Sequence, residues 1–242
     1  MEAGLAILIV LTLGLAGSAG VLSPRATERE QNETAAENDS TKASQENENK
    51  TSASNPDTEE TQETIADGQY PIMGSSNITV QEMVDYFNAS GEVYPAEELS
   101  EGGADSIETF CQMYYDEATA EGVRPEVAFA QTMKETGFLQ YGGDASIEQF
   151  NFAGLGTTGN SVPGNSYPDV QTGIRAQIQH LKAYATADAL NQECVDDRYE
   201  YVKKGSAPYV QWLGQQENPE GLGWATGDNY GYDIVGMIEE MM

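Results

Sequence analysis

One acidic residue, Glu135, has the surroundings that acid chemistry needs. It lies in the segment 131–139 (QTMKETGFL), where the pattern predicts the last turn of a short helix, followed by a glycine and two apolar side chains. The negative end of the helix dipole and apolar neighbours both disfavour a carboxylate, so they raise its pKa. A carboxyl group that keeps its proton near neutral pH can serve as the general acid of glycoside cleavage. The alternative is that Glu135 is simply an exposed glutamate at the end of a helix, as most glutamates at such positions are.

The helices that must hold Glu135 follow from apolar spacing. Apolar residues recur at helical intervals over residues 107–118, and Gly122 is a natural C-terminal stop. Pro125 then suits the first turn of the next helix, which we expect to run to Thr136 and to end at Gly137.

The rest of the chain divides into further helices and loops. The stretch 139–167 is dense in Gly, Asn, Ser, Thr and Pro, which predicts loops and a short hairpin. Residues 224–232 are typical of a loop rich in glycine and aromatic residues. The single histidine, His180, falls beside the apolar face of a predicted helix, where a satisfied boundary residue is the expected role. The remaining helices are expected at 80–87 (capped near Asn77 or Thr79), 173–184 and 234–240, with short ones at 199–202 and 208–213.

Composition separates an N-terminal part from a folded domain at 70–242. Residues 25–69 are rich in Glu, Asn, Ser and Thr and almost lack aromatic residues, which predicts a disordered acidic linker. Residues 1–24 are mostly apolar and contain a cluster of small residues, which predicts a signal peptide. Glu2 stands where a basic residue is expected, and the apolar run is long enough to span a bilayer, so a retained membrane anchor stays open. Either way, the domain is expected outside the cytoplasm.

The charge balance restricts the partners of this chain. The formal net charge is -29, from 40 acidic and 11 basic residues. Binding to nucleic acid requires a basic surface, so nucleic acid is not an expected partner. The same charge opposes adhesion to anionic membrane surfaces. Solubility and self-repulsion are the plain explanation of the excess.

The chain contains two cysteines, Cys111 and Cys194. An even count in an exported chain favours one disulfide, and two free thiols are the alternative. The sequence has no cluster of His and Cys residues, so no metal site is expected.

Two stretches resemble a known family of hydrolases. They are residues 128–138 (AFAQTMKETGF) and 151–156 (NFAGLG), and a third, 224–230 (WATGDNY), follows in the expected order. Together they resemble the glucosaminidase family related to mannosyl-glycoprotein endo-β-N-acetylglucosaminidase, glycoside hydrolase family 73. The resemblance covers about residues 70–242 and implies a mainly α (α+β), lysozyme-like single domain with a glycine-rich insert.

The resemblance implies cleavage of the bond between N-acetylglucosamine and N-acetylmuramic acid in peptidoglycan, with no cofactor. Glu135 matches the catalytic acid, and Tyr230 matches a tyrosine that orients the substrate. A structural tyrosine remains the alternative for Tyr230, as core packing does for Phe152. The positions expected to bind substrate are Gly137, Asn151, Phe152, Gly154, Trp224 and Asn229.

The second catalytic group departs from the family pattern. Many members carry a second acidic residue in a hairpin after the Asn-x-x-Gly motif, but residues 157–168 contain none. Asp169 is the first acid beyond them and is the candidate base. An inverting mechanism would need it about 6.5–9.5 Å from Glu135. Alternatively, the substrate's own 2-acetamido group attacks the anomeric carbon, steadied by Tyr230.

Two rival functions remain at this stage. A lytic transglycosylase would use the same fold and a single glutamate to form an anhydro sugar. A non-catalytic wall-binding module would use aromatic residues such as Trp212 and Trp224 as stacking platforms for sugars. We expect a monomer whose partner is the glycan strand of peptidoglycan, either secreted or tethered to the cell membrane facing the wall.

Overall fold

The computed structural model describes residues 68–76, 78–143, 145–157 and 162–242. The predicted signal peptide or anchor at 1–24, and the predicted linker up to residue 67, lie outside the described residues. No helix within the described part of the chain is both long enough and apolar enough to cross a membrane.

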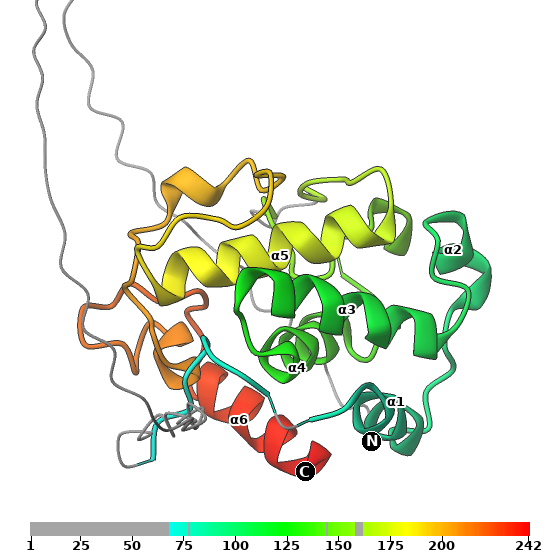
Figure 1. Ribbon diagram of the computed structural model, residues 1–242, viewed down its shortest axis with the longest axis horizontal. Helices are drawn as coiled ribbons and strands as arrows, with labels where there is room; N and C mark the ends of the chain where they lie inside the picture. The colour runs from blue at the N-terminus through cyan, green and yellow to red at the C-terminus, as the bar shows by residue number, and fades with distance from the viewer. Residues whose placement is uncertain (1–67, 77, 144, 158–161) are drawn as a thin grey trace, which may run out of the picture. The chain divides into compact units, whose positions relative to one another are not determined.

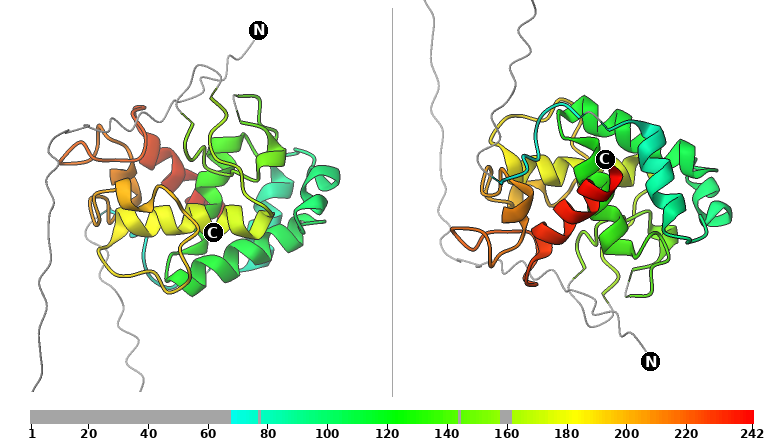
Figure 2. Two further views of the ribbon diagram at one scale, coloured as in Figure 1. Left: turned by 90° about the horizontal axis from the view of Figure 1, so that it is seen from above. Right: turned by 90° about the horizontal axis from the view of Figure 1, so that it is seen from below.

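Helix α4 (Pro125–Thr136) lies at the centre of the domain (Figure 1). All but two of its residues are buried, as expected for a core helix that is packed on every side. It contacts α3 (Ile107–Glu121), α5 (Val170–Ala185) and α6 (Tyr230–Met241). Helices α3 and α5 run side by side in Figures 1 and 2, and α6 contacts the side of α4 that carries Glu135.

Local sequence signals fix the ends of these helices. Helix α1 (Val80–Ala89) begins with a capping box in which Thr79 and Glu82 bond each other's backbone N–H groups. Gly122 ends α3 in the left-handed conformation, with φ 75°. The predicted bounds of α4 are confirmed at both ends.

The glycine-rich insert contains a 3-10 turn, η1 (Ile147–Gln149), and loops. The predicted hairpin falls partly on residues 158–161, outside the described residues. Between α5 and α6 lie two more 3-10 turns, η2 (Tyr199–Tyr201) and η3 (Val210–Leu213), where short helices are predicted. The fold is therefore mainly α and lysozyme-like, as expected.

Two predicted helix starts are wrong, and one helix was not predicted. Helix α5 begins three residues before the predicted start, because Asp169 caps it. Helix α6 begins at Tyr230, four residues before the predicted start and within the segment expected to be a loop. Helix α2 (Ala96–Glu101) is absent from the prediction because six residues give too little periodicity to recognise.

Candidate active site

A left-handed turn follows Glu135 and sets the end of α4. Gly137, Phe138 and Leu139 have φ angles of 58°, 55° and 64°. Only glycine adopts this region without cost, so the two apolar residues carry strain of about 1–3 kcal/mol each. The Thr136 hydroxyl donates to the Thr132 carbonyl at 2.7 Å and accepts from the Leu139 N–H at 2.9 Å. This turn stops α4 one residue beyond Glu135.

Glu135 is only partly exposed, and burial of its carboxyl group raises its pKa to about 7. The hydrogen bond from Tyr230 and the charge of Lys134 act in the opposite direction. Lys134 is itself paired with Asp233 of α6 at 2.8 Å. Glu135 is therefore a partly exposed residue whose carboxyl group keeps its proton up to neutral pH.

Tyr230 contacts the acid directly. Its hydroxyl donates to Glu135 Oε1 and accepts from Gln131 Nε2 at 3.0 Å. The side chain is almost fully buried, at 2% exposure, so its aromatic face is not open to a sugar. The hydroxyl expected to orient substrate is instead bound to Glu135.

The Asn-x-x-Gly motif shapes a loop, and two of its side chains are buried. Asn151 is buried, and its amide bonds the backbone of Leu155 at 2.8 and 2.9 Å. Phe152 has no exposed surface and packs edge-on against Phe110 at 5.2 Å. Both side chains are buried in this conformation, so their contact with substrate stays a prediction, and Phe152 takes part in core packing. Gly154, in the left-handed region at φ 62°, lines a small pocket beside α5.

Of the last two predicted substrate-binding residues, Trp224 is buried and Asn229 is exposed. The Trp224 ring is 2% exposed and lies edge-on to His180, with ring centroids 4.8 Å apart. Its faces are therefore not a platform for sugars, although Trp224 lines the same pocket as Gly154. Asn229 is exposed, precedes α6 in the left-handed conformation, and donates its N–H to Glu217 at 2.8 Å.

Asp169, the predicted base, serves as the N-cap of α5. Its carboxylate accepts from the Thr172 N–H at 2.7 Å. The adjacent Val170 N–H bonds Gly102, so this end of α5 lies next to α2. The α5 residue that reaches the hydrogen bonds around Glu135 is Gln177, two turns further along the helix. The geometry therefore gives Asp169 a structural role at the N-terminal end of α5, two turns away from Gln177.

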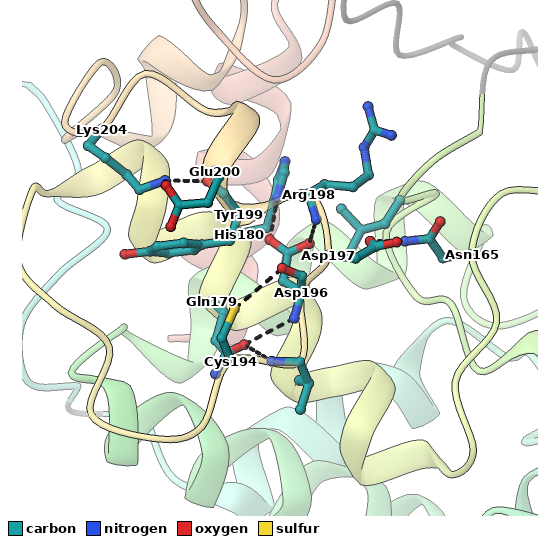
Figure 3. Close-up of polar contacts among 12 residues, drawn as sticks. Asn165, Gln179, His180, Cys194, Asp196, Asp197, Arg198, Tyr199, Glu200 and Lys204 are labelled. Carbon is teal, nitrogen blue, oxygen red and sulfur yellow. Dashed lines mark hydrogen bonds and ion pairs between the residues drawn. The ribbon is translucent and has the colours of Figure 1, made fainter. Parts of the chain in front are cut away.

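The segment 193–198 is held against α5 by polar contacts (Figure 3). His180 Nδ1 and Asp196 Oδ2 are 2.7 Å apart, and Gln179 Oε1 accepts from the Val195 N–H at 2.8 Å. His180 is buried. It is therefore a satisfied structural residue, as its helical position predicts.

The predicted disulfide is wrong, because both cysteines are free thiols. Cys111 is buried on the core face of α3, where burial raises the pKa of its thiol above the ordinary range. Cys194 is exposed beside α5, and its thiol donates to the Asp196 carbonyl at 3.4 Å (Figure 3). An even count of cysteines fixes neither their positions nor their pairing.

Comparison with known families agrees with this geometry. The sequence model of the glucosaminidase family, described as mannosyl-glycoprotein endo-β-N-acetylglucosaminidase, matches residues 111–242. The chain belongs to this glucosaminidase family. The match includes α4 with Glu135 and α6 with Tyr230.

A curated relative of this chain is an uncharacterized protein of Borreliella burgdorferi, 44% identical over 104 residues. The alignment covers 43% of this chain and 51% of the relative, so the chain spans about half the length of the curated relative that it matches. No solved structure matches.

The candidate site also contains residues that the sequence did not predict. Gln131 and Gln177 are fully buried. Gln177 donates a hydrogen bond to Gln131, and Gln131 donates one to the Tyr230 hydroxyl. A signal was present, because both are polar residues at positions that face inward on α4 and α5. In the described residues, no group of three or more His, Cys, Asp or Glu side chains is placed to hold a metal ion.

Proposed function

We propose that this glucosaminidase hydrolyses the β-1,4 bond between N-acetylglucosamine and N-acetylmuramic acid in peptidoglycan, with Glu135 as general acid. The observation that carries the proposal is the contact between the partly buried Glu135 and the Tyr230 hydroxyl, in a family of glycosidases. Burial of the carboxyl group raises the pKa of Glu135 to about 7. The protonated carboxyl group donates to the glycosidic oxygen as that bond breaks, and the sugar passes through an oxocarbenium-like transition state.

The attacking group is, in our proposal, the substrate's own 2-acetamido oxygen. Two observations support it: Asp169 is committed to the cap of α5, and residues 162–168 contain no acid. The acetamido route needs no second carboxylate and retains the configuration at the anomeric carbon. Proton NMR of the fresh reducing end should show the β anomer. An initial α anomer would reinstate a carboxylate base, with Asp169 as the first candidate.

The domain would act outside the cytoplasm, where peptidoglycan lies, either secreted or tethered through residues 1–24. This proposal is supported by the apolar N-terminal segment of the sequence. We further propose that the protein acts as a monomer on glycan strands.

The deciding experiment compares the full chain with its Glu135→Gln variant on purified peptidoglycan. Mass spectrometry of reduced soluble products should show fragments ending in reduced N-acetylglucosamine. The variant should form them about 10²–10⁴-fold more slowly. Products with anhydromuramyl ends would identify a lytic transglycosylase. Retained wall binding without any soluble product would identify a non-catalytic binding module.

A further inference from the structure

A chain of buried side chains connects the core to the acid. Tyr114, Gln131, Thr132 and Gln177 have no exposed surface and come from α3, α4 and α5. Buried polar atoms are costly unless they are hydrogen-bonded, so each amide here is expected to have one preferred orientation. The bonds in this chain have directions that can be worked out from one fixed end.

The fixed end is the backbone carbonyl of Ala128, which can only accept. Gln177 lies with its side-chain amide 3.0 Å from this oxygen. If the amide were turned over, two carbonyl oxygens would face each other at that distance, so Nε2 must point to Ala128. The second N–H of the same nitrogen then donates to Gln131 Oε1 at 2.9 Å.

The orientation of Gln131 follows from that of Gln177. Because Oε1 of Gln131 accepts from Gln177, its Nε2 must face Tyr230 and donate to the phenolic oxygen at 3.0 Å. The phenolic oxygen has a single proton to give, and Glu135 Oε1 is its remaining partner. The direction of every bond from Ala128 to Glu135 is thereby determined.

The partners of Gln177 Oε1 are consistent with this orientation of the Gln177 amide. Gln177 Oε1 lies 2.7 Å from the Tyr114 hydroxyl and 2.9 Å from the Thr132 hydroxyl, which lie 2.6 Å from each other. Whichever hydroxyl donates to the other, one proton remains for Gln177 Oε1. Loss of the Tyr114 hydroxyl would leave Thr132 to supply it, so this side does not set the orientation of the amide.

We propose that Gln177 is a positioning residue that, through Gln131 and Tyr230, confines the acidic proton of Glu135 to Oε2, the oxygen left for substrate. This inference rests on the proposed role of Glu135 as general acid. When Glu135 is protonated, Tyr230 donates to Oε1, so Oε1 cannot also carry the proton toward Tyr230. After proton transfer, the same donation stabilises the carboxylate that remains.

The surroundings of Glu135 allow this effect to be isolated. The charged groups beside it are Lys134 on α4 and its partner Asp233 on α6. Burial raises the pKa of Tyr230, and Tyr184 of α5 acts in the same direction. None of these residues takes part in the series of hydrogen bonds that links Ala128 to Tyr230. A substitution of Gln177 therefore leaves them in place.

The test is Gln177→Glu, which is nearly isosteric and reverses the direction of hydrogen-bond donation between residue 177 and Glu135. A buried neutral glutamic acid donates its proton to the Ala128 carbonyl and offers Gln131 only lone pairs. Gln131 must then turn its amide, Tyr230 donates to Gln131, and Glu135 donates to Tyr230. We expect the pKa of Glu135 to rise by about one unit and kcat to fall at least about tenfold, with KM little changed.

Three further variants make the result specific. Gln177→Met removes the hydrogen bonds of residue 177 without reversing the direction of the others. A smaller rise in the pKa of Glu135 is therefore expected. Tyr114→Phe is the matched control, because it removes a hydroxyl from the other side of Gln177 and should leave the pH profile unchanged. The double variant Tyr230→Phe/Gln177→Glu should have a kcat no lower than that of Tyr230→Phe alone, because Gln177 acts only through Tyr230.

Direct titration separates this inference from the proposed function. Carbon-13 NMR of side-chain carboxyl groups, with the Glu135 signal assigned by its loss in Glu135→Gln, reports the pKa even in a protein that cleaves nothing. A folded Gln177→Glu protein whose Glu135 titrates as in the unmodified chain would overturn the inference. Equal shifts in Gln177→Glu and Tyr114→Phe would also overturn it, because general loosening of the core would then explain both.

Discussion

At the scale of single residues, the protonation of Glu135 should control activity. The pKa of about 7 means that the acid form is lost as pH rises past neutrality. We therefore expect kcat/KM on soluble peptidoglycan fragments to fall about tenfold per pH unit well above pH 7. A profile from pH 4 to pH 9 checks this. A rate that stays constant to pH 9 would contradict Glu135 as the acid.

The same carboxyl group should cost the protein stability at high pH. Its pKa is raised in the folded state above an ordinary value of 4.5, so the folded protein binds more protons than the unfolded chain between these pH values. The contribution of Glu135 to stability is therefore fully present below about pH 4.5 and is lost as pH rises through about 7. Glu135→Gln removes this loss and should raise the free energy of unfolding by up to about 3 kcal/mol at pH 8.

Thermal unfolding at pH 4 and pH 8 tests this expectation. The melting temperature of Glu135→Gln should exceed that of the unmodified chain at pH 8 and approach or fall below it at pH 4. Glu239→Gln removes a charge from the exposed side of α6 and serves as the control. An equal gain at pH 8 in both variants would show that net charge, rather than the buried acid, is responsible.

At the scale of elements, α6 must lie close to η3 to place Tyr230. A Cβ atom on Gly231 would lie 2.1 Å from the Val210 carbonyl and 2.5 Å from Gln211 Cα. Both are backbone atoms, which cannot move aside cheaply. Gly231→Ala should therefore displace the start of α6, together with the adjacent Tyr230 hydroxyl.

We expect Gly231→Ala to lower stability by more than 2 kcal/mol and to reduce kcat strongly. Gly236→Ala is the matched control, because it lies on the same helix and a Cβ atom there has no neighbour within 4 Å. Replacing a helical glycine at such a site should stabilise the protein by about 0.5–1 kcal/mol and leave kcat unchanged. Equal melting temperatures of the two variants would show that close packing at Gly231 is unimportant.

At the scale of the whole molecule, folding does not depend on a disulfide. Both thiols are free, so a reducing agent should leave the melting temperature within error. Thiol titration with Ellman's reagent should find Cys194 accessible in the folded protein and Cys111 only after denaturation, because Cys111 has no exposed surface. A drop in melting temperature of several degrees on reduction would mean that the cysteines pair in solution.

Local signals in the sequence determined much of this protein. Capping residues, glycine stops and helical spacing placed α1, α3 and α4 close to their observed positions, because each signal acts within one or two turns of chain. The same signals placed Glu135 in the last turn of α4. The motifs around it indicated the family, which the comparison of residues 111–242 then confirmed.

Only the tertiary structure decided what surrounds Glu135. Tyr230 is 95 positions away along the chain, and Gln177 reaches Gln131 across 46 positions. Phe152 lies in the motif of a binding loop, yet it is drawn into the core because Phe110 offers its ring an apolar partner. Side-chain burial and the direction of hydrogen bonds depend on contacts between distant segments, which local sequence patterns do not encode.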